Sequence, residues 1–273
     1  MLIVHLHAFK CAGSTFSWIL EKNFPGGVLY IESKNPSERL RWSEAQKVLA
    51  NKKEVKAVTS HLLESPPTSD PKSYLIVELI RCPVSRYLSA FRFQKKVGQI
   101  KSDTSFVQYL QAHRNTIRSN FISRHLSPQS FDMVEGKHKG WRLNTNSIEL
   151  NRNDLFVGTV ERFDESMVLL ENLIREQGKS IDLSYPQVQN QTSDDENDKS
   201  AFDGISNELL HDLTSEDNSL VARVNKYLDE KIANCDNFGY LLDNYKKRCI
   251  SLIGDDMVKD VRTPPPAKWK YVH

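Results

Sequence analysis

Short uninterrupted apolar runs recur along the chain and alternate with longer stretches in which apolar residues are spaced as on a helix. The clearest run is Tyr74–Ile80, and others cover Met1–Leu6, Val28–Ile31, Val55–Thr59 and Leu155–Val160. Runs of this length are typical of parallel strands that are covered on both faces. Strands that alternate with helices predict a doubly wound α/β fold, in which helices flank a central, mostly parallel sheet in three layers.

The segments between the strands contain residues that favour helix starts. Ser14 or Thr15 is expected to cap a helix through Trp18–Leu20, and Thr214 with Asp217 has the pattern of a capping box ahead of a late helix. Further helices are predicted over 38–51 (capped from 35–37), from Pro83 onward, over 105–113, 119–126 and 164–176, and around 220–232.

The length of the chain fits one large α/β domain, because 273 residues are few for two ordinary domains. We predict a single domain over 1–273, with a polar surface loop at 187–200 and an extended tail from about residue 254. No signal peptide and no apolar run of about eighteen residues is evident, which predicts a cytoplasmic protein without a membrane span. The oligomeric state is left open.

Composition and charge narrow the choice of partners. The formal net charge is +2, which gives no indication of nucleic-acid binding. The four cysteines, Cys11, Cys82, Cys235 and Cys249, lie far apart and include no C-x-x-C pair, so we expect free thiols in a reducing compartment. No His, Cys or carboxylate cluster has the spacing of metal ligands, and no metal is expected.

A short loop after the first strand is the first candidate site. It carries Lys10 and Gly13 and leads directly into a helix. The free N–H groups and the positive dipole end of a helix N-terminus bind anions, and Lys10 adds a full charge, so the pattern predicts a phosphate or sulfate site with a P-loop-like geometry. In a Walker A loop the lysine follows the last glycine. Here Lys10 precedes Gly13, which disfavours an ordinary ATP or GTP site.

A second cluster follows the run that ends at Ile80. Arg81 comes directly after this strand, and Ser89 lies two turns into the helix that Pro83 begins. The two side chains can hold one phosphate from two sides, the arginine through a forked contact. Because parallel sheets bind ligands at the carboxyl ends of their strands, both clusters are expected at one edge.

These motifs resemble those of sulfotransferases that use 3′-phosphoadenosine 5′-phosphosulfate (PAPS), most closely the carbohydrate branch with its heparan sulfate 2-O-type and bacterial enzymes. In that branch a strand ending in His leads into Lys-Thr-Ala-Gly-Thr, the 5′-phosphosulfate loop. The segment from Arg81 resembles the 3′-phosphate motif Arg-Asp-Pro-x-x-Arg-x-x-Ser, with Cys82 in place of the aspartate. Residues 157–166 resemble Val-Gly-x-x-Glu-Arg-Phe-Asp-Glu-Ser, and 120–126 resemble Asn-x-x-x-Arg-x-Leu. The resemblance covers roughly residues 1–175.

The resemblance implies transfer of a sulfuryl group from PAPS to an acceptor hydroxyl, most directly that of a carbohydrate or glycoconjugate, with adenosine 3′,5′-bisphosphate as product. Lys10 would neutralise the leaving phosphate. A histidine after the third strand is the catalytic base in the family, and His61 occupies that place, with Ser60 where the family has glycine. A neutral imidazole suits proton removal; His7 is the competing candidate. The residues that the resemblance assigns to the nucleotide are Lys10, Cys11, Ala12, Gly13, Ser14, Thr15, Arg81 and Ser89.

Three other functions compete with this interpretation. The first is a small-molecule or lipid O-sulfotransferase, which would have a more closed, apolar acceptor pocket. The second is a nucleotide-dependent phosphotransferase such as a kinase. The position of Lys10 and the lack of an obvious Mg²⁺-binding aspartate disfavour it. The third is a protein that binds the nucleotide without catalysis, against which the presence of His61 argues.

Overall fold

The fold was obtained as a computed structural model, which describes most of the chain. The predicted loop at 187–200 lies outside the described residues, as does the tail from 254 except for its last strand. The described residues are 1–35, 38–67, 74–114, 116, 118–126, 148–186, 202–253 and 270–272.

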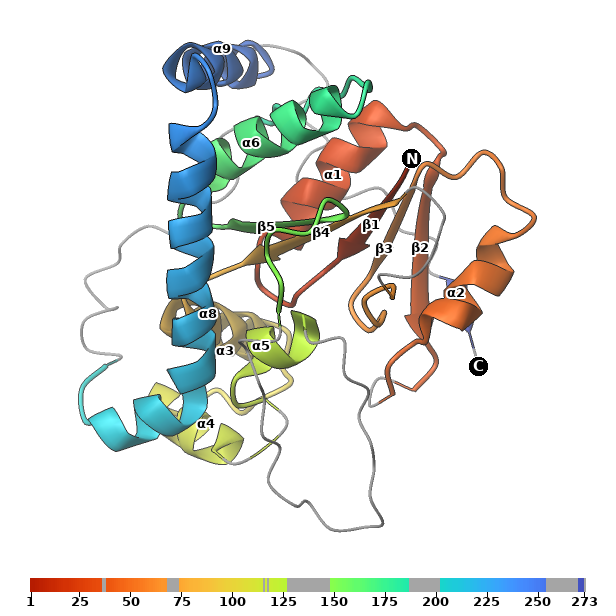
Figure 1. The fold of residues 1–273 in the computed structure, drawn as a ribbon. Coiled ribbons are helices and arrows are strands. Elements are labelled where there is room, and N and C mark those ends of the chain that lie inside the picture. The colour runs from red at the N-terminus through yellow and green to blue at the C-terminus, as the bar shows by residue number, and fades with distance from the viewer. Residues whose placement is uncertain are drawn as a thin grey trace.

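A six-stranded sheet forms the centre of the molecule (Figure 1). All of its strand pairs are parallel, and the strand order is β5-β4-β1-β3-β2-β6. The sequence-based prediction of a three-layer α/β fold is therefore confirmed. The strands are β1 (Leu2–Leu6), β2 (Val28–Ser33), β3 (Ala57–Ser60), β4 (Tyr74–Ile80), β5 (Leu155–Thr159) and β6 (Lys270–Val272).

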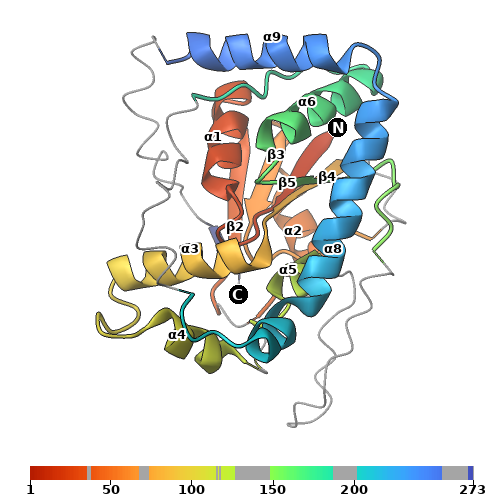
Figure 2. The same ribbon diagram turned by 90° about the vertical axis from the view of Figure 1, so that its left-hand side faces the viewer.

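Helices cover both faces of the sheet. Figures 1 and 2 show α1 and α6 on one face and α2 on the other, while α3, α4 and α5 gather beyond the carboxyl ends of the strands. Helix α8 runs past the β5 edge, and α9 packs on α6. The helices are α1 (Gly13–Asn23), α2 (Trp42–Leu49), α3 (Pro83–Lys96), α4 (Phe106–His113), α5 (Phe121–Leu126), α6 (Phe163–Glu176), α8 (Asn207–Ala233) and α9 (Phe238–Ser251).

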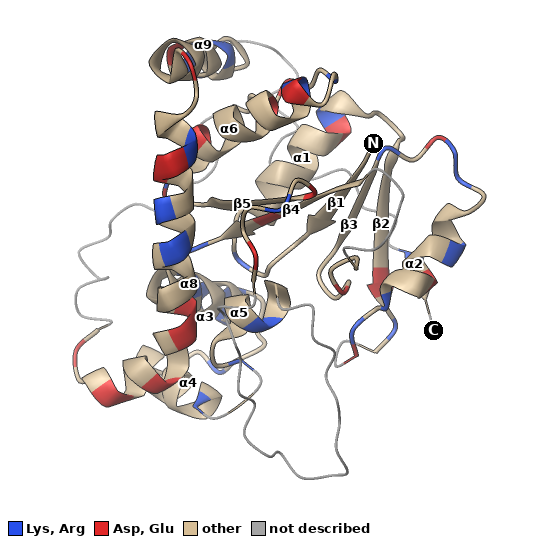
Figure 3. Cartoon of the chain, viewed as in Figure 1, with Lys and Arg blue, Asp and Glu red and all other residues tan. Residues whose placement is uncertain are grey.

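The core follows from the apolar runs. All seven residues of β4 are buried, and α1 buries Phe16, Ile19 and Leu20 completely against the sheet. Figure 3 shows charged residues spread over the helices and loops, while the strands are largely free of them. Glu32 on β2 and Glu78 on β4 are exceptions, since both carboxylates are buried. A buried carboxylate requires hydrogen-bond partners, and both belong to the site described below.

Two predicted helix starts at the N-terminal side are wrong. Helix α1 begins at Gly13, with Ala12 as its N-cap at φ 59°, so Ser14 and Thr15 lie in the first turn and do not cap it. Helix α2 begins at Trp42 instead of residue 38, where the Arg41 N–H donates to the Glu44 carboxylate in a reciprocal cap. In both cases a local backbone arrangement overrides the capping preference of Ser and Thr.

The predicted capping box at Thr214 and Asp217 is also wrong. Helix α8 begins earlier, at Asn207, and is capped by Ser206. Thr214 lies inside it and donates its hydroxyl to the Leu210 carbonyl at 2.7 Å. Asp217 is buried and accepts the N–H groups of two residues of α5.

Helix α9 and strand β6 were not among the predicted elements. None of the helices in the described ranges combines the length and the apolar character that a membrane crossing requires.

Candidate active site

The carboxyl ends of four neighbouring strands bring the candidate residues to one edge of the sheet. His7 follows β1, His61 follows β3, Arg81 follows β4, and Glu32 lies near the end of β2. The β2–β3 register pairs Tyr30 with Thr59, which sets Glu32 beside His61 two residues further along each strand. The fold therefore assembles groups that are far apart in sequence, as parallel α/β sheets do at their ligand-binding edge.

His61 forms a hydrogen-bonded pair with Glu32. The Glu32 Oε1 atom lies 2.9 Å from His61 Nδ1 and also accepts the His61 backbone N–H at 2.5 Å. Because a carboxylate can only accept, Nδ1 is the donor, and Nε2 carries the lone pair of the neutral imidazole. The His61 side chain is 36% exposed and lines a cavity, whereas Glu32 is 10% exposed. The sequence interpretation missed Glu32, although a carboxylate directly after the run Val28–Ile31 was a usable signal.

His7 is a weaker candidate for the base. Its ring stacks on that of His61 with centroids 4.0 Å apart, and its Nδ1 atom is buried without a partner among the described residues. Burial, and then the charge of His61, lower the pKa of His7 well below its usual range. A group with so low a pKa accepts a proton poorly, and His7 is not part of the cavity wall. The geometry therefore favours His61.

The loop after β1 folds around His7. Lys10 and Ala12 both adopt positive φ values, 66° and 59°, which turn the chain sharply into α1. A Cβ atom on Gly13 would lie 1.8 Å from His7 Cδ2, so only glycine allows the helix to begin against this ring. The N–H groups of Gly13 and Ser14 belong to the first helical turn and have no intrahelical acceptors, as expected for an anion site.

Lys10 extends from this loop over the ring of Phe93, with Nζ 4.7 Å from the centroid. In the described part of the chain it forms no ion pair. Burial, and then the nearby charge of Arg81, lower the pKa of Lys10. Cys11 is buried and its pKa is raised to about 12, so any contact with an anion there would come from its backbone.

Arg81 and Ser89 occupy the end of β4 and the middle of α3. The Arg81 Nε atom is buried and has no hydrogen-bond partner among the described residues. The backbone turns into α3 at Cys82, whose N–H donates to Glu161 Oε1 at 2.9 Å. Ser89 is half-buried, and no hydrogen bond joins it to Arg81 in the described residues. The structure thus brings Arg81 near Lys10 and leaves the predicted grip of Ser89 a prediction.

A second histidine–carboxylate pair lies behind His61. His125 Nδ1 is 2.9 Å from Glu78 Oε1, and His125 Nε2 is 2.9 Å from the His61 carbonyl oxygen. Both side chains are buried, and Arg39 binds the carbonyls of Arg124 and His125. This network ties the backbone at His61 to α5 and β4, which fixes its position at the sheet edge.

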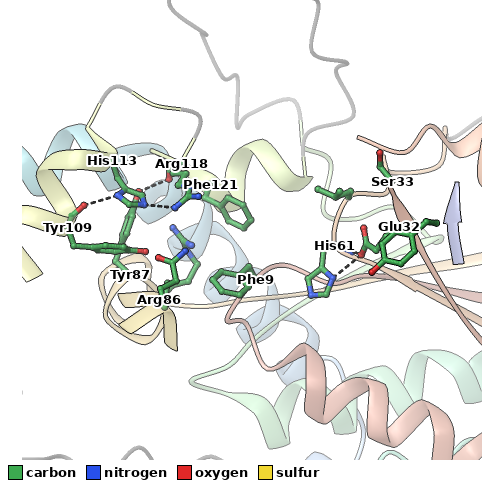
Figure 4. A pocket seen from close by; sticks show the side chains of 14 residues that line it. Phe9, Glu32, Ser33, His61, Arg86, Tyr87, Tyr109, His113, Arg118 and Phe121 are labelled. Atoms are coloured by element: carbon green, nitrogen blue, oxygen red, sulfur yellow. Dashed lines mark hydrogen bonds and ion pairs between the residues drawn. The ribbon is translucent and has the colours of Figure 1, made fainter. Parts of the chain in front are cut away.

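A cavity of about 460 Å³ opens beside His61 (Figure 4). Phe9 lies between His61 at one end and Arg86 with Arg118 at the other. Within the described ranges, no three His, Cys, Asp or Glu side chains gather in a way that could hold a metal ion. Half of the fourteen residues that line the cavity are aromatic or aliphatic, and the other half are polar or ionisable: Phe9, Glu32, Ser33, His61, Leu62, Arg86, Tyr87, Ala90, Gln94, Tyr109, His113, Arg118, Phe121 and Tyr271.

Comparison with known proteins adds a relative without an assigned activity. No family model matches the chain. An uncharacterized protein from Archaeoglobus fulgidus is 29% identical over 194 residues, which cover 64% of this chain and 74% of that protein. The comparisons therefore assign neither a family nor a reaction, and the functional argument depends on the motifs and the site.

Proposed function

We propose that the protein is a PAPS-dependent O-sulfotransferase. The observation that carries the proposal is the assembly, at one sheet edge, of the Lys10 loop at the start of α1, of Arg81, whose Nε atom has no partner in the described part of the chain, and of His61 beside a cavity. Lys10 and Arg81 are close enough for the charge of one to lower the pKa of the other. Neither cation forms an ion pair within the described ranges, and two such cations near each other favour a ligand with more than one anionic group, such as a nucleotide that is phosphorylated at both the 3′ and 5′ positions.

The residues at the loop fit such a nucleotide. The backbone N–H groups of Gly13 and Ser14 would bind the 5′-phosphate, and Lys10 would neutralise the charge that builds on it as sulfate leaves. Arg81 would bind the 3′-phosphate, for which its Nε atom, without a partner among the residues that the structure describes, is a suitable donor. When bound, PAPS supplies an activated sulfuryl group that needs only in-line transfer to an oxygen.

His61 would remove the proton from the acceptor hydroxyl. Glu32 holds the donor hydrogen on Nδ1, so in the neutral ring Nε2 would be the nitrogen that accepts the proton, and the carboxylate would stabilise the imidazolium that forms. In this arrangement Glu32 is a positioning residue that acts through His61.

The acceptor is a hydroxylated compound that fits the cavity. A carbohydrate or glycoconjugate is the class that the motifs imply. The aromatic and apolar walls, contributed by Phe9, Leu62, Tyr87, Tyr109 and Phe121, favour the second candidate, a small-molecule or lipid acceptor. A sugar would use the same walls by stacking the apolar face of its ring.

The test is release of adenosine 3′,5′-bisphosphate from PAPS in the presence of a panel of sugar, phenol and lipid-alcohol acceptors, without metal. Lys10→Ala should abolish transfer. His61→Ala should lower kcat by about 10²–10⁴-fold while leaving nucleotide affinity nearly unchanged, and Glu32→Gln should lower kcat in the same direction. Full turnover by the His61 variant would show that the base is another group, and His7→Ala would then be tested. Metal-dependent ATP turnover by the wild type would instead favour a phosphotransferase.

A further inference from the structure

Arg86 is buried at the end of the cavity away from His61, and part of its guanidinium group has no hydrogen-bond partner in the described part of the chain. Its side chain belongs to α3 and lines the cavity, although the residue is only 4% exposed. Two of its guanidinium nitrogens, Nε and Nη2, have no partner among the described residues. Burying the donor atoms of a charged group without acceptors is costly, so such donors in a cavity wall point to a ligand that supplies the missing acceptor.

The neighbours of Arg86 hold the guanidinium without neutralising it. The Arg86 Cζ atom lies 4.5 Å from the ring centroid of Tyr87 and 4.6 Å from that of Phe121. Asp217 is near enough for the charge of Arg86 to oppose the rise that burial causes in the pKa of Asp217. The Asp217 oxygens, however, accept the backbone N–H groups of α5 at 2.8 and 3.2 Å, and they form no ion pair with Arg86 in the described part of the chain.

A second cation lies at the same end of the cavity. Arg118 Nη1 is 2.9 Å from His113 Nε2, and His113 Nδ1 is 2.7 Å from the Tyr109 carbonyl oxygen. Since the carbonyl can only accept, Nδ1 is protonated and Nε2 accepts from Arg118. Burial lowers the pKa of His113, which agrees with a neutral ring. Arg118 is therefore held by a neutral partner and keeps its positive charge for the cavity.

The geometry points to an anion-binding subsite at Arg86 and Arg118, which selects hydroxylated ring compounds that carry a carboxylate or sulfate group. The aromatic walls would cover the faces of the ring, and the acidic group would pair with Arg86 by a forked contact. The orientation of the hydroxyl toward His61 rests on the proposed function. The binding of the acidic group does not, because it depends on the two arginines alone.

The experiment compares two probes that differ in a single group, p-nitrophenyl β-D-glucuronide and p-nitrophenyl β-D-glucoside. Their binding to the full chain is measured by ligand-observed NMR titration for the wild type, Arg86→Gln and Arg86→Lys. As a matched control, Lys226→Gln removes the same charge from an exposed position on α8 outside the cavity. We expect the wild type and the control to prefer the glucuronide by about tenfold to a hundredfold, the effect of one charged hydrogen-bonded contact.

Arg86→Gln should abolish this preference, and Arg86→Lys should retain part of it. Equal affinity of the wild type for the two probes, no binding of either, or the same preference in Arg86→Gln as in the wild type, would overturn the proposal. Circular dichroism and thermal unfolding identify a variant that fails to fold, in which case the Arg86→Lys comparison decides. Titration of the same proteins with adenosine 3′,5′-bisphosphate reports separately on the nucleotide site, so failure of the proposed function is distinguishable from failure of this subsite.

Discussion

We expect the free energy of unfolding to fall as the pH is lowered, and His5 to account for a measurable part of this loss. This residue lies on β1, is 1% exposed, and shares a 2.8 Å hydrogen bond between its Nδ1 and Thr59 Oγ1. Burial, followed by the charges of His61 and His125, lowers its pKa from 6.5 to about 3. The folded state therefore keeps His5 neutral, whereas the unfolded chain binds a proton below pH 6.5. Stability from this group is fully present above pH 6.5 and is lost as the pH falls toward 3.

The size of the effect follows from the difference between the two pKa values. Each pH unit below 6.5 costs about 1.4 kcal/mol of unfolding free energy. At pH 4.5 the contribution of His5 is therefore about 2.7 kcal/mol smaller than at pH 7.5. His7, whose pKa is lowered for the same reason, acts with the same sign. Carboxylates also titrate in this range, so the effect of one histidine must be obtained as a difference between variants.

Urea unfolding at pH 7.5 and pH 4.5 measures this difference. For His5→Gln we expect the loss of stability between the two pH values to be smaller than in the wild type by about 2.7 kcal/mol. Thr59→Val is the matched control, because it removes the hydrogen bond and keeps the titrating ring. It should lower stability at both pH values by a similar amount. A His5→Gln protein with the same pH dependence as the wild type would refute the reasoning.

Three other substitutions test the site. Gly13→Ala should lower the melting temperature by about 2–12 °C, because the new Cβ would collide with the His7 imidazole. Gly239→Ala is the control: a Cβ there meets no atom within 4 Å, and the melting temperature should stay unchanged or rise slightly. Glu78→Gln should cost about 3–5 kcal/mol in chemical denaturation by leaving His125 without its buried carboxylate; a loss under about 1 kcal/mol, the size of a surface pair, would show that the pair is unimportant. Arg81→Ala should weaken calorimetric binding of adenosine 3′,5′-bisphosphate about tenfold to a hundredfold and leave 5′-AMP nearly unaffected; equal losses would contradict the 3′-phosphate role.

Strands that are buried on both faces could be predicted from the sequence, because apolar residues fill most of their positions and the strand is therefore visible as an apolar run. The bounds of β4 agree with the run Tyr74–Ile80, and β1, β2, β3 and β5 agree within a few residues. Strand β6 has no such signal, since Lys270–Val272 becomes a strand only by pairing with β2. Helix α9 buries few side chains, among them Tyr245 and Cys249, so its apolar stripe is weak.

In the candidate site, too, some residues could be predicted from the sequence and others could not. Lys10, His61 and Arg81 could be assigned to one edge, because each follows a predicted strand of a parallel sheet. Their partners could not, because partnership depends on strand order. Glu32 reaches His61 only because β2 is the neighbour of β3. The burial of Arg86, with two guanidinium nitrogens that lack a partner among the described residues, likewise depends on how the helices pack.

The most direct test of the central claim is calorimetric titration of the protein with adenosine 3′,5′-bisphosphate, and with ADP and ATP in the absence of metal. The two cations at the loop and at the end of β4 predict binding of the bisphosphate, with ADP and ATP binding far more weakly. Preference for ADP or ATP, or no binding of any nucleotide, would contradict the proposal that this sheet edge holds the sulfuryl donor.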